Sequence, residues 1–313
     1  MINTQKVQLK KGLLFICIVI AFGLQSCQKE ISDPLNTVTP GPVSADSTYI
    51  DKIYSIDVNG SISDTVTTTV YTYDSQKRVI SFITTSNNPA DSSADKYYYY
   101  YTGTDTLPYK SVYYEIATGV PVQTYIYTYF HYYDNSGRNS RDSLILQDPS
   151  AYYVTVIQYN YGLNKIYASK VSFTTTLGYF APEDEKDTAF LDPKGNILQS
   201  KQYVLNPITS IYELNSISNF TYDNQISPFY KLSNLKSFGV LPYGESYLGG
   251  LPQYSNRTSQ DQFFHLNTPF IGELAYTYTY TYKSNGLVKQ GIQYDVPASL
   301  THYSKALFTY RAL

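Results

Sequence analysis

Strict alternation of tyrosine and threonine in residues 275–290, AYTYTYTYKSNGLVKQ, constrains the fold of this chain more than any other feature. Side chains along a β-strand point alternately to the two faces of the sheet. The four tyrosines of residues 276–282 therefore share one face, and the intervening threonines share the other. Both residue types favour a pleated surface, and the Asn285-Gly286 pair that follows is typical of a tight turn between antiparallel strands. The stretch predicts one β-hairpin.

Similar runs, separated by short turns rich in Gly, Asn, Asp and Pro, recur along the chain. Their spacing of about 8 to 14 residues favours an antiparallel meander over parallel βαβ units. The fold class predicted is all-β, an antiparallel meander of repeated β-hairpins forming a large twisted sheet or roll, and the sequence leaves open whether the sheet closes. The predicted strands are 49–58, 62–73, 78–85, 94–102, 107–116, 121–133, 138–146, 152–161 and 165–176.

Several hairpins share a motif in which an aromatic residue and a tyrosine precede an aspartate, followed by a turn and a Gly or Arg. An aspartate at this place is expected to cap the turn by accepting hydrogen bonds from the backbone amides that follow it. Two departures are visible, since Lys283 replaces the aspartate in one copy and Gln76-Lys77 replaces the usual turn glycine in another. The copies are 71–79, 131–138, 220–223 and 280–288, with a degenerate one at 190–197.

The amino-terminal residues carry an export signal. Lys6, Lys10 and Lys11 precede an apolar run at 13–24 that has the length of a secretory leader rather than of a membrane span. Leu24-Gln25-Ser26-Cys27 follows and resembles the lipobox of bacterial lipoproteins. The resemblance implies cleavage before Cys27 and acylation of its sulfur and new amino terminus, and several acyl chains anchor a protein stably. The alternative is that 13–24 remains as an uncleaved anchor.

These features divide the chain into three parts: a lipoprotein signal peptide at 1–26, the acylated cysteine with a flexible, proline-containing tether at 27–47, and one β-hairpin-repeat domain at 48–313 with an irregular insertion at 224–270. The other cysteine, Cys17, lies in the leader, so the mature chain would have neither a disulfide nor a thiol nucleophile.

The hairpin motif resembles the YD repeats of Rhs-type shells. Together with the leader it makes the chain similar to uncharacterised Gram-negative, Bacteroidota-type lipoproteins with hairpin-repeat domains. The resemblance implies a lipid-anchored protein of the outer membrane, on its periplasmic or cell-surface face. The role expected for such a protein is non-catalytic. The charged start at 28–30 also resembles the short signals that direct some such lipoproteins to the cell surface.

Charge and composition narrow the possible partners. Lys plus Arg number 23 against 25 Asp plus Glu, which excludes a strongly basic nucleic-acid binder. There are 37 tyrosines and no tryptophan, so tyrosine supplies most of the aromatic contact area. Tyrosine offers a large, low-entropy surface with a polar tip, a property used at recognition surfaces.

The insertion at 224–270 is aromatic, and we expect it to be ordered and to shape a binding pocket. The alternative is a structural plug that closes the end of the sheet. The candidate ligand-binding residues are Tyr230, Phe238, Tyr243, Tyr247, Tyr254 and Phe263.

Motifs for catalysis, metals or cofactors are not found, so no such residues and no cofactor are predicted. His131, which alternates with tyrosines, is interpreted as an ordinary sheet residue, and neither His265 nor His302 has a second ligand at metal spacing. The acidic cluster at 183–187 is interpreted as a solvated turn. Glycoside hydrolysis needs two positioned carboxylates, and no partner is evident for the in-strand acids Glu115, Glu213 and Glu273.

The function predicted from sequence is non-catalytic binding of a glycan, a tetrapyrrole or another envelope ligand through a tyrosine-rich β surface. The alternative is a structural or assembly lipoprotein that pairs with an envelope protein through a free sheet edge. In both cases the membrane is contacted through the lipid on Cys27.

Overall fold

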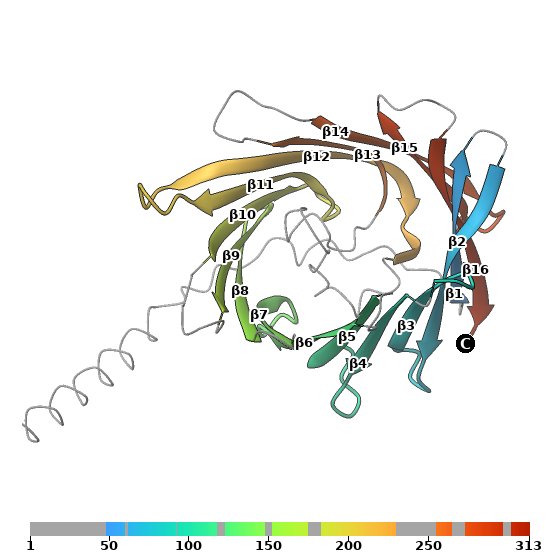
Figure 1. The fold of residues 1–313 in the computed structure, drawn as a ribbon, viewed down its shortest axis with the longest axis horizontal. Helices are drawn as coiled ribbons and strands as arrows, with labels where there is room; N and C mark the ends of the chain where they lie inside the picture. The colour runs from blue at the N-terminus through green and yellow to red at the C-terminus, as the bar shows by residue number, and fades with distance from the viewer. Residues whose placement is uncertain are drawn as a thin grey trace, which may run out of the picture. The chain divides into compact units, whose positions relative to one another are not determined.

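The computed structural model describes residues 48–59, 62–91, 93–117, 123–147, 152–174, 183–229, 255–264, 273–296 and 302–313. Over these ranges the chain forms sixteen strands, which Figure 1 shows arranged around a ring. The strands are β1 (Thr48–Asn59), β2 (Ile62–Tyr73), β3 (Val79–Ser86), β4 (Ala94–Tyr100), β5 (Lys110–Ala117), β6 (Gln123–Tyr133), β7 (Asn139–Gln147), β8 (Tyr152–Gly162), β9 (Lys165–Thr174), β10 (Glu183–Leu191), β11 (Ile197–Leu205), β12 (Tyr212–Ile226), β13 (Ser255–Phe264), β14 (Glu273–Tyr282), β15 (Val288–Val296) and β16 (His302–Ala312).

The sheet closes into a barrel. Each strand pairs antiparallel with its neighbours in sequence, and β1 pairs with β16, with Ile53 opposite Phe308 and Tyr54 opposite Leu307. The predicted open twisted sheet or roll is therefore wrong. Local hairpin signals establish which consecutive strands pair, whereas closure depends on two strands at opposite ends of the chain. Since every described strand has a neighbour on both sides, the free sheet edge expected for a partner is absent from this part of the chain, whereas the structural or assembly role itself stays a prediction.

The predicted strands between residues 49 and 176 are confirmed to within a few residues at their ends. Two expectations further along the chain are wrong. The acidic cluster at 183–187 begins β10 instead of forming a turn, and Asp187 is buried. The segment 224–270, expected to be irregular, contains the end of β12 and all of β13. No helix in the described ranges is long and apolar enough to cross a membrane.

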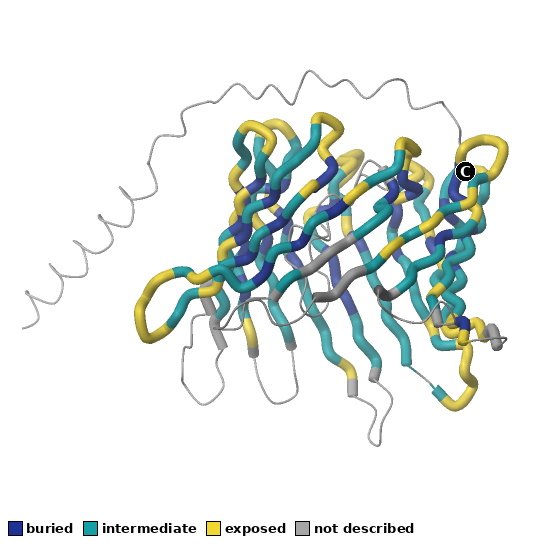
Figure 2. Tube along the Cα trace, turned by 90° about the horizontal axis from the view of Figure 1, so that it is seen from above, coloured by how far each residue is buried: buried dark blue, intermediate teal, exposed yellow. Residues whose placement is uncertain are grey.

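Alternation along the strands separates an inner from an outer face. Tyr71 is 6% exposed, whereas its neighbour Val70 on the other face is 38% exposed. In Figure 2 the buried stretches interrupt partly exposed strands, and exposed residues gather in the tight turns. Two clusters of inward-facing apolar side chains form the core. The first contains Ile50, Ile53, Tyr71, Val79, Tyr99, Val288 and Phe308, and the second Ile157, Tyr159, Ile166, Ala168, Ala189, Ile197 and Phe220.

The tight turns that follow β2, β6, β8, β10 and β14 lie at one end of the barrel, the turn rim. The predicted capping role of the motif aspartates is confirmed there. The carboxylate of Asp74 accepts backbone N–H bonds from Gln76 and Arg78, both at 2.9 Å, and a 2.7 Å bond from the Arg78 side chain. Asp134 and Asp192 repeat the arrangement in their own turns.

The missing turn glycine before Arg78 is replaced by a strained residue. Lys77 occupies the place of Gly137, Gly195 and Gly286, and it adopts the same left-handed backbone, with φ of 65°. A residue with a Cβ pays about 1–2 kcal/mol for this conformation. The capping bonds of Asp74 hold the turn in spite of that cost.

Tyrosines join the strand pairs that no turn connects at the turn rim, which we call seams. Tyr73 at the end of β2 donates a 2.8 Å hydrogen bond to the carbonyl of Ile50 in β1, and Tyr101 after β4 donates one of 2.7 Å to the carbonyl of Val79 in β3. Turns and tyrosine bonds therefore alternate around most of the rim, with exceptions at the seams between β9 and β10 and between β13 and β14. The same bond is made by Tyr133 to Pro108, Tyr161 to Asn139, Tyr222 to Ile197 and Tyr310 to Val288.

Candidate functional site

Of the six sequence-predicted site residues, one lies in the ranges that the structure describes, so whether they come together is not tested. Phe263 lies in β13, where its register partner Ile217 and the inward, buried Phe220 place it on the outer face of the barrel. Tyr230, Phe238, Tyr243, Tyr247 and Tyr254, like Cys27, lie outside the described residues. The candidate ligand-binding group consequently remains a prediction.

Just before this stretch, the chain turns toward the barrel interior. Ser227 and Pro228 are buried, and the ring of Phe229 meets the inward-facing ring of Phe308 edge-on, with 6.0 Å between centroids. Phe308 belongs to the first apolar cluster on the inner wall. The described part of β12 and its continuation therefore end inside the barrel.

Aromatic rings cross the inner wall from β2 to β6. Tyr71, Phe82, Tyr97, Tyr113 and Tyr127 are register partners on consecutive strands, and we call them the inner aromatic row. The Phe82–Tyr97 and Tyr97–Tyr113 centroids are 4.3 Å apart and the Tyr113–Tyr127 centroids 5.1 Å apart, with interplanar angles of 24°, 11° and 24°. Neighbouring strands lie about 4.8 Å apart, so side chains in register stack face to face. Their hydroxyl groups remain for other contacts.

Two carboxylates accept hydrogen bonds from this row. The hydroxyl of Tyr113 donates to Asp95 at 2.7 Å, and that of Tyr127 donates to Glu115 at 3.2 Å. Asp95 and Glu115 are register partners on β4 and β5, and both are partly exposed. We call them the inner carboxylate pair. Neither forms an ion pair with a described Lys or Arg.

Burial and the Asp95 carboxylate raise the pKa of Tyr113 far above its ordinary value. The pKa of Tyr97 is also raised, first by burial and then by Asp95. These phenols consequently stay protonated at neutral pH and act as donors. Like charges directly opposite one another destabilise a sheet. The inner carboxylate pair places two acidic side chains directly opposite one another on the inner wall.

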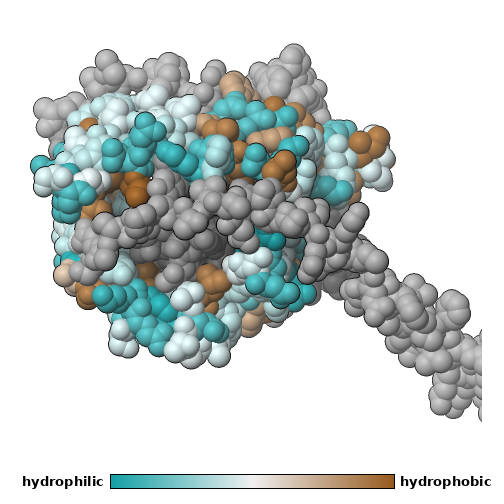
Figure 3. All heavy atoms as spheres, turned by 180° about the vertical axis from the view of Figure 1, so that it is seen from behind, coloured by the Kyte–Doolittle hydropathy of each residue, from teal (hydrophilic) through white to brown (hydrophobic). Residues whose placement is uncertain are grey.

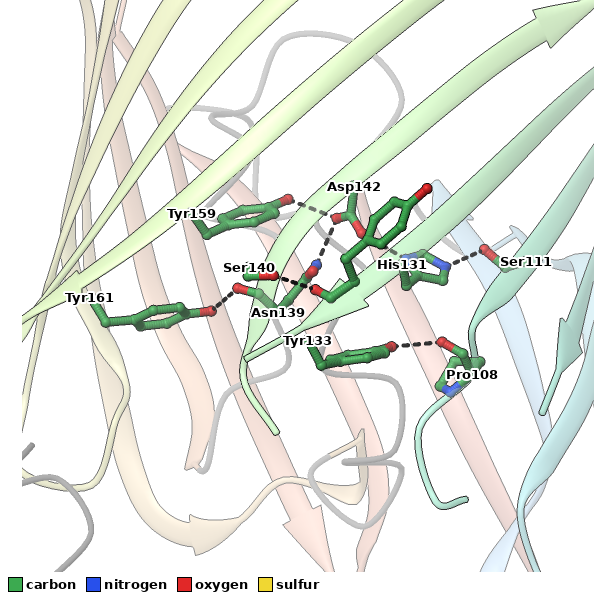
Figure 4. A network of polar contacts seen from close by, with 10 residues as sticks. Pro108, Ser111, His131, Tyr133, Asn139, Ser140, Asp142, Tyr159 and Tyr161 are labelled. Carbon is green, nitrogen blue, oxygen red and sulfur yellow. Dashed lines mark hydrogen bonds and ion pairs between the residues drawn. The ribbon is translucent and has the colours of Figure 1, made fainter. Parts of the chain in front are cut away.

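A buried polar network lies beside the row (Figure 4). Ser111 lies 2.9 Å from His131 Nε2, and His131 Nδ1 lies 2.7 Å from Asp142 Oδ1. The other oxygen of Asp142 accepts bonds from Asn139 at 2.7 Å and Tyr159 at 3.0 Å. A carboxylate only accepts hydrogen bonds, so Nδ1 carries a proton. In the neutral ring, Nε2 then accepts the hydroxyl hydrogen of Ser111.

The connectivity is that of a Ser-His-Asp triad, but its burial argues against a reaction. Ser111 and Asp142 are each 1% exposed and His131 is 6% exposed. Ser111 lies in register between Tyr99 and Tyr129, both 4% exposed, which close it off on two sides. A nucleophile must be reached by its substrate, so this network joins β5, β6, β7 and β8 as a structural element.

Sequence reasoning placed His131 correctly in a strand but missed this network. Ser111, His131 and Asp142 come from three strands, and they meet only because β5, β6 and β7 pair in one particular register. The only sequence signal was an isolated histidine in a tyrosine strand next to a strand with an Asp. Strand register, which was not fixed by the sequence patterns, was needed to connect them.

The described inner wall lacks the features that a tetrapyrrole site needs. A tetrapyrrole needs free ring faces and, for haem iron, an axial ligand. Internal stacking covers the faces within the aromatic row, and both ring nitrogens of His131 are engaged. In the described ranges no group of three or more His, Cys, Asp or Glu side chains is placed to hold a metal ion.

Comparison with known proteins gives no family. No protein-family model matches the chain, and no curated protein sequence matches it. Among solved structures, a porin-like protein from Bacteroides vulgatus is 11% identical with a TM-score of 0.49, covering 85% of this chain and 100% of that one. A porin-like protein from Bacteroides uniformis is 13% identical with a TM-score of 0.36, covering 84% of this chain and 98% of that one. Likenesses this distant carry no argument about function.

Proposed function

We propose that this protein is a lipid-anchored outer-membrane protein that binds a glycan on the inner wall of its barrel without chemical conversion. The observation that carries the proposal is the inner carboxylate pair, Asp95 and Glu115, each held by a phenol hydroxyl of the inner aromatic row. Carboxylates accept hydrogen bonds strongly, and neighbouring hydroxyl groups of a sugar can supply two donors to each.

The stacked row supports this role because it preorganises the acceptors. Tyr97, Tyr113 and Tyr127 are held by their stacking, so the groups that receive a ligand lose little conformational freedom on binding. The proposed binding surface differs from the one expected from sequence. It lies on regular strands of the inner wall, whereas the insertion at 224–270 was expected to provide it.

The lipid anchor is supported by the lipobox-like residues ending in Cys27 and by the tether that follows. Thr48, where the described barrel begins, lies on the turn rim beside Ala312. The anchor would therefore attach to the barrel at that rim. Incorporation of radiolabelled palmitate into the wild-type chain, and its absence in Cys27→Ser, would test this attachment.

Glycan binding can be tested with the full-length protein on a glycan array followed by calorimetric titration of any hit. The double variant Asp95→Asn/Glu115→Gln keeps the size of both side chains but removes their charge, and we expect at least tenfold weaker binding. Asp64→Asn, which changes an exposed acid in β2, is the matched control and should bind like the wild type. Binding that is equal in all three proteins, or no binding to any glycan, would contradict the proposal.

A further inference from the structure

The strand register shows which side chains lie on the outer wall of the barrel, and several of them are polar or charged. In β11, Ser200 and Gln202 are buried on the inner face, so Lys201 between them points outward. In β10, the buried Asp187 and Ala189 likewise place Lys186 and Thr188 on the outer face. The outward lysines are thus assigned by the alternation of the strands.

Lysines occupy the outer face in the interior of several strands around the barrel. Each is at least two residues from either end of its strand, and each is flanked by an inward-facing residue. The five are Lys52 in β1, Lys96 in β4, Lys186 in β10, Lys201 in β11 and Lys305 in β16.

Polar side chains extend this surface between the lysines. Thr277, Thr279 and Thr281 of β14 are exposed on the face opposite the tyrosines. Figure 3 looks onto one end of the barrel, where hydrophobic residues form separate small patches among hydrophilic ones around the opening. The two large apolar clusters face the interior instead.

A barrel that spans a membrane has an apolar outer band, and the outward lysines and threonines of this wall do not fit such a band. We infer that the barrel stands outside the bilayer, with water against its outer wall, and that the membrane is reached only through the lipid on Cys27. Only the lipid anchor in this inference rests on the proposed function. That the outer wall faces water is inferred from the side chains of the wall itself.

Single cysteines on the wall test the inference in the full-length protein. In outer-membrane fragments, where both membrane faces are open to reagent, Thr277→Cys and Lys186→Cys should react with a charged, membrane-impermeant maleimide. The rate should be within a fewfold of that of Leu163→Cys, a turn position that is 66% exposed. Ala189→Cys, at an inward position that is 0% exposed, should not react, and the wild-type chain gives the background.

Protection of both wall cysteines to the level of Ala189→Cys, with Leu163→Cys still reactive, would show lipid against the wall and overturn the inference. A second measurement uses Cys27→Ser, which should be recovered without detergent after cell lysis. Retention of this variant in membranes through an alkaline wash would also overturn it. Absence of palmitate from the wild-type chain would instead refute the anchor, and the maleimide rates would still decide the position of the wall.

Discussion

Single residues of this barrel fall into those whose role is local and those whose role depends on register. The capping role of Asp74 was predictable, because its partners Gln76 and Arg78 are at most four positions away. The role of His131 was not, because Ser111 and Asp142 reach it from other strands. A local role can be predicted directly from the sequence pattern. A role that depends on partners in other strands can be assigned only once the strand register is known.

The Asp74 carboxylate should give the protein a measurable acid dependence. Burial raises its pKa, but the hydrogen bonds from Arg78 and from the Gln76 amide outweigh that effect and hold the pKa below its ordinary value. A lowered folded-state pKa adds stability above the unfolded value of about 3.9, and this stability is lost as pH falls through the folded pKa. We expect Asp74→Asn to cost about 1 kcal/mol at pH 7 and less at pH 3, measured by urea unfolding.

The exposed Asp64 provides the control for this measurement. Asp64→Asn should change the free energy of unfolding by no more than about 0.5 kcal/mol at pH 7. An Asp74→Asn penalty that was as large at pH 3 as at pH 7 would show that the charge on this residue does not act as described.

In the buried network, we expect His131→Ala to destabilise the protein far more than Ser111→Ala. Removing the ring leaves the buried Asp142 without one of its donors, which costs about 3 kcal/mol or more. Removing the Ser111 hydroxyl costs one neutral hydrogen bond, about 1 kcal/mol. Urea unfolding of the two variants gives the order, and equal losses would contradict the central position assigned to His131.

At the scale of elements, hairpins were predictable and the bonds between them were not. Short turns containing Asp, Asn, Gly or Pro mark where most strands end, so most boundaries follow from sequence. The tyrosine at or near the end of many of the even-numbered strands was recognised as part of the motif, but its hydroxyl partner at a seam lies 22 to 25 positions back in the chain, as for Tyr101 and Tyr133. Leu191 takes this place at the seam between β9 and β10 and has no hydroxyl to donate.

Loss of one seam hydroxyl should have a small, additive cost. Tyr101→Phe and Tyr161→Phe each remove one bond to a backbone carbonyl, so each should lose about 1 kcal/mol of unfolding free energy. The two sites share no partner, and the double variant should lose the sum. Tyr100→Phe, on the exposed outer face, is the control and should be neutral. A double variant as stable as either single one would argue against independent seams.

At the scale of the whole molecule, closure decides which surface faces water. A Lys on the lipid face costs about 2–4 kcal/mol near the bilayer mid-plane. Each outward lysine placed there would cost a sizeable part of the net stability of a domain, about 5–15 kcal/mol. Alternation of residue types in the sequence assigns side chains to the two faces of each strand. Which of these faces lines the interior becomes clear only once the sheet is known to close into a barrel.

Closure can be tested by a cross-link between the first and last strands. Ser55 and Ala306 are register partners, and opposed residues of antiparallel strands have Cα separations of about 4.5–5.5 Å, which suit a disulfide. Ser55→Cys/Ala306→Cys should form a bond on oxidation that alters mobility in a denaturing gel and stabilises the fold by up to about 5 kcal/mol. Each single variant is a control. Failure of the double variant to cross-link while folded would indicate an open sheet.

The pairing of Thr48 with Ala312 has one more consequence. The two ends of the barrel lie side by side, so a short peptide could join them, and the chain could be reopened in the exposed 206–211 loop between β11 and β12 without unpairing any strands. Such a circular permutant would start and finish at the opposite end of the cylinder. The order in which the hairpins leave the ribosome would then be separable from the structure they build.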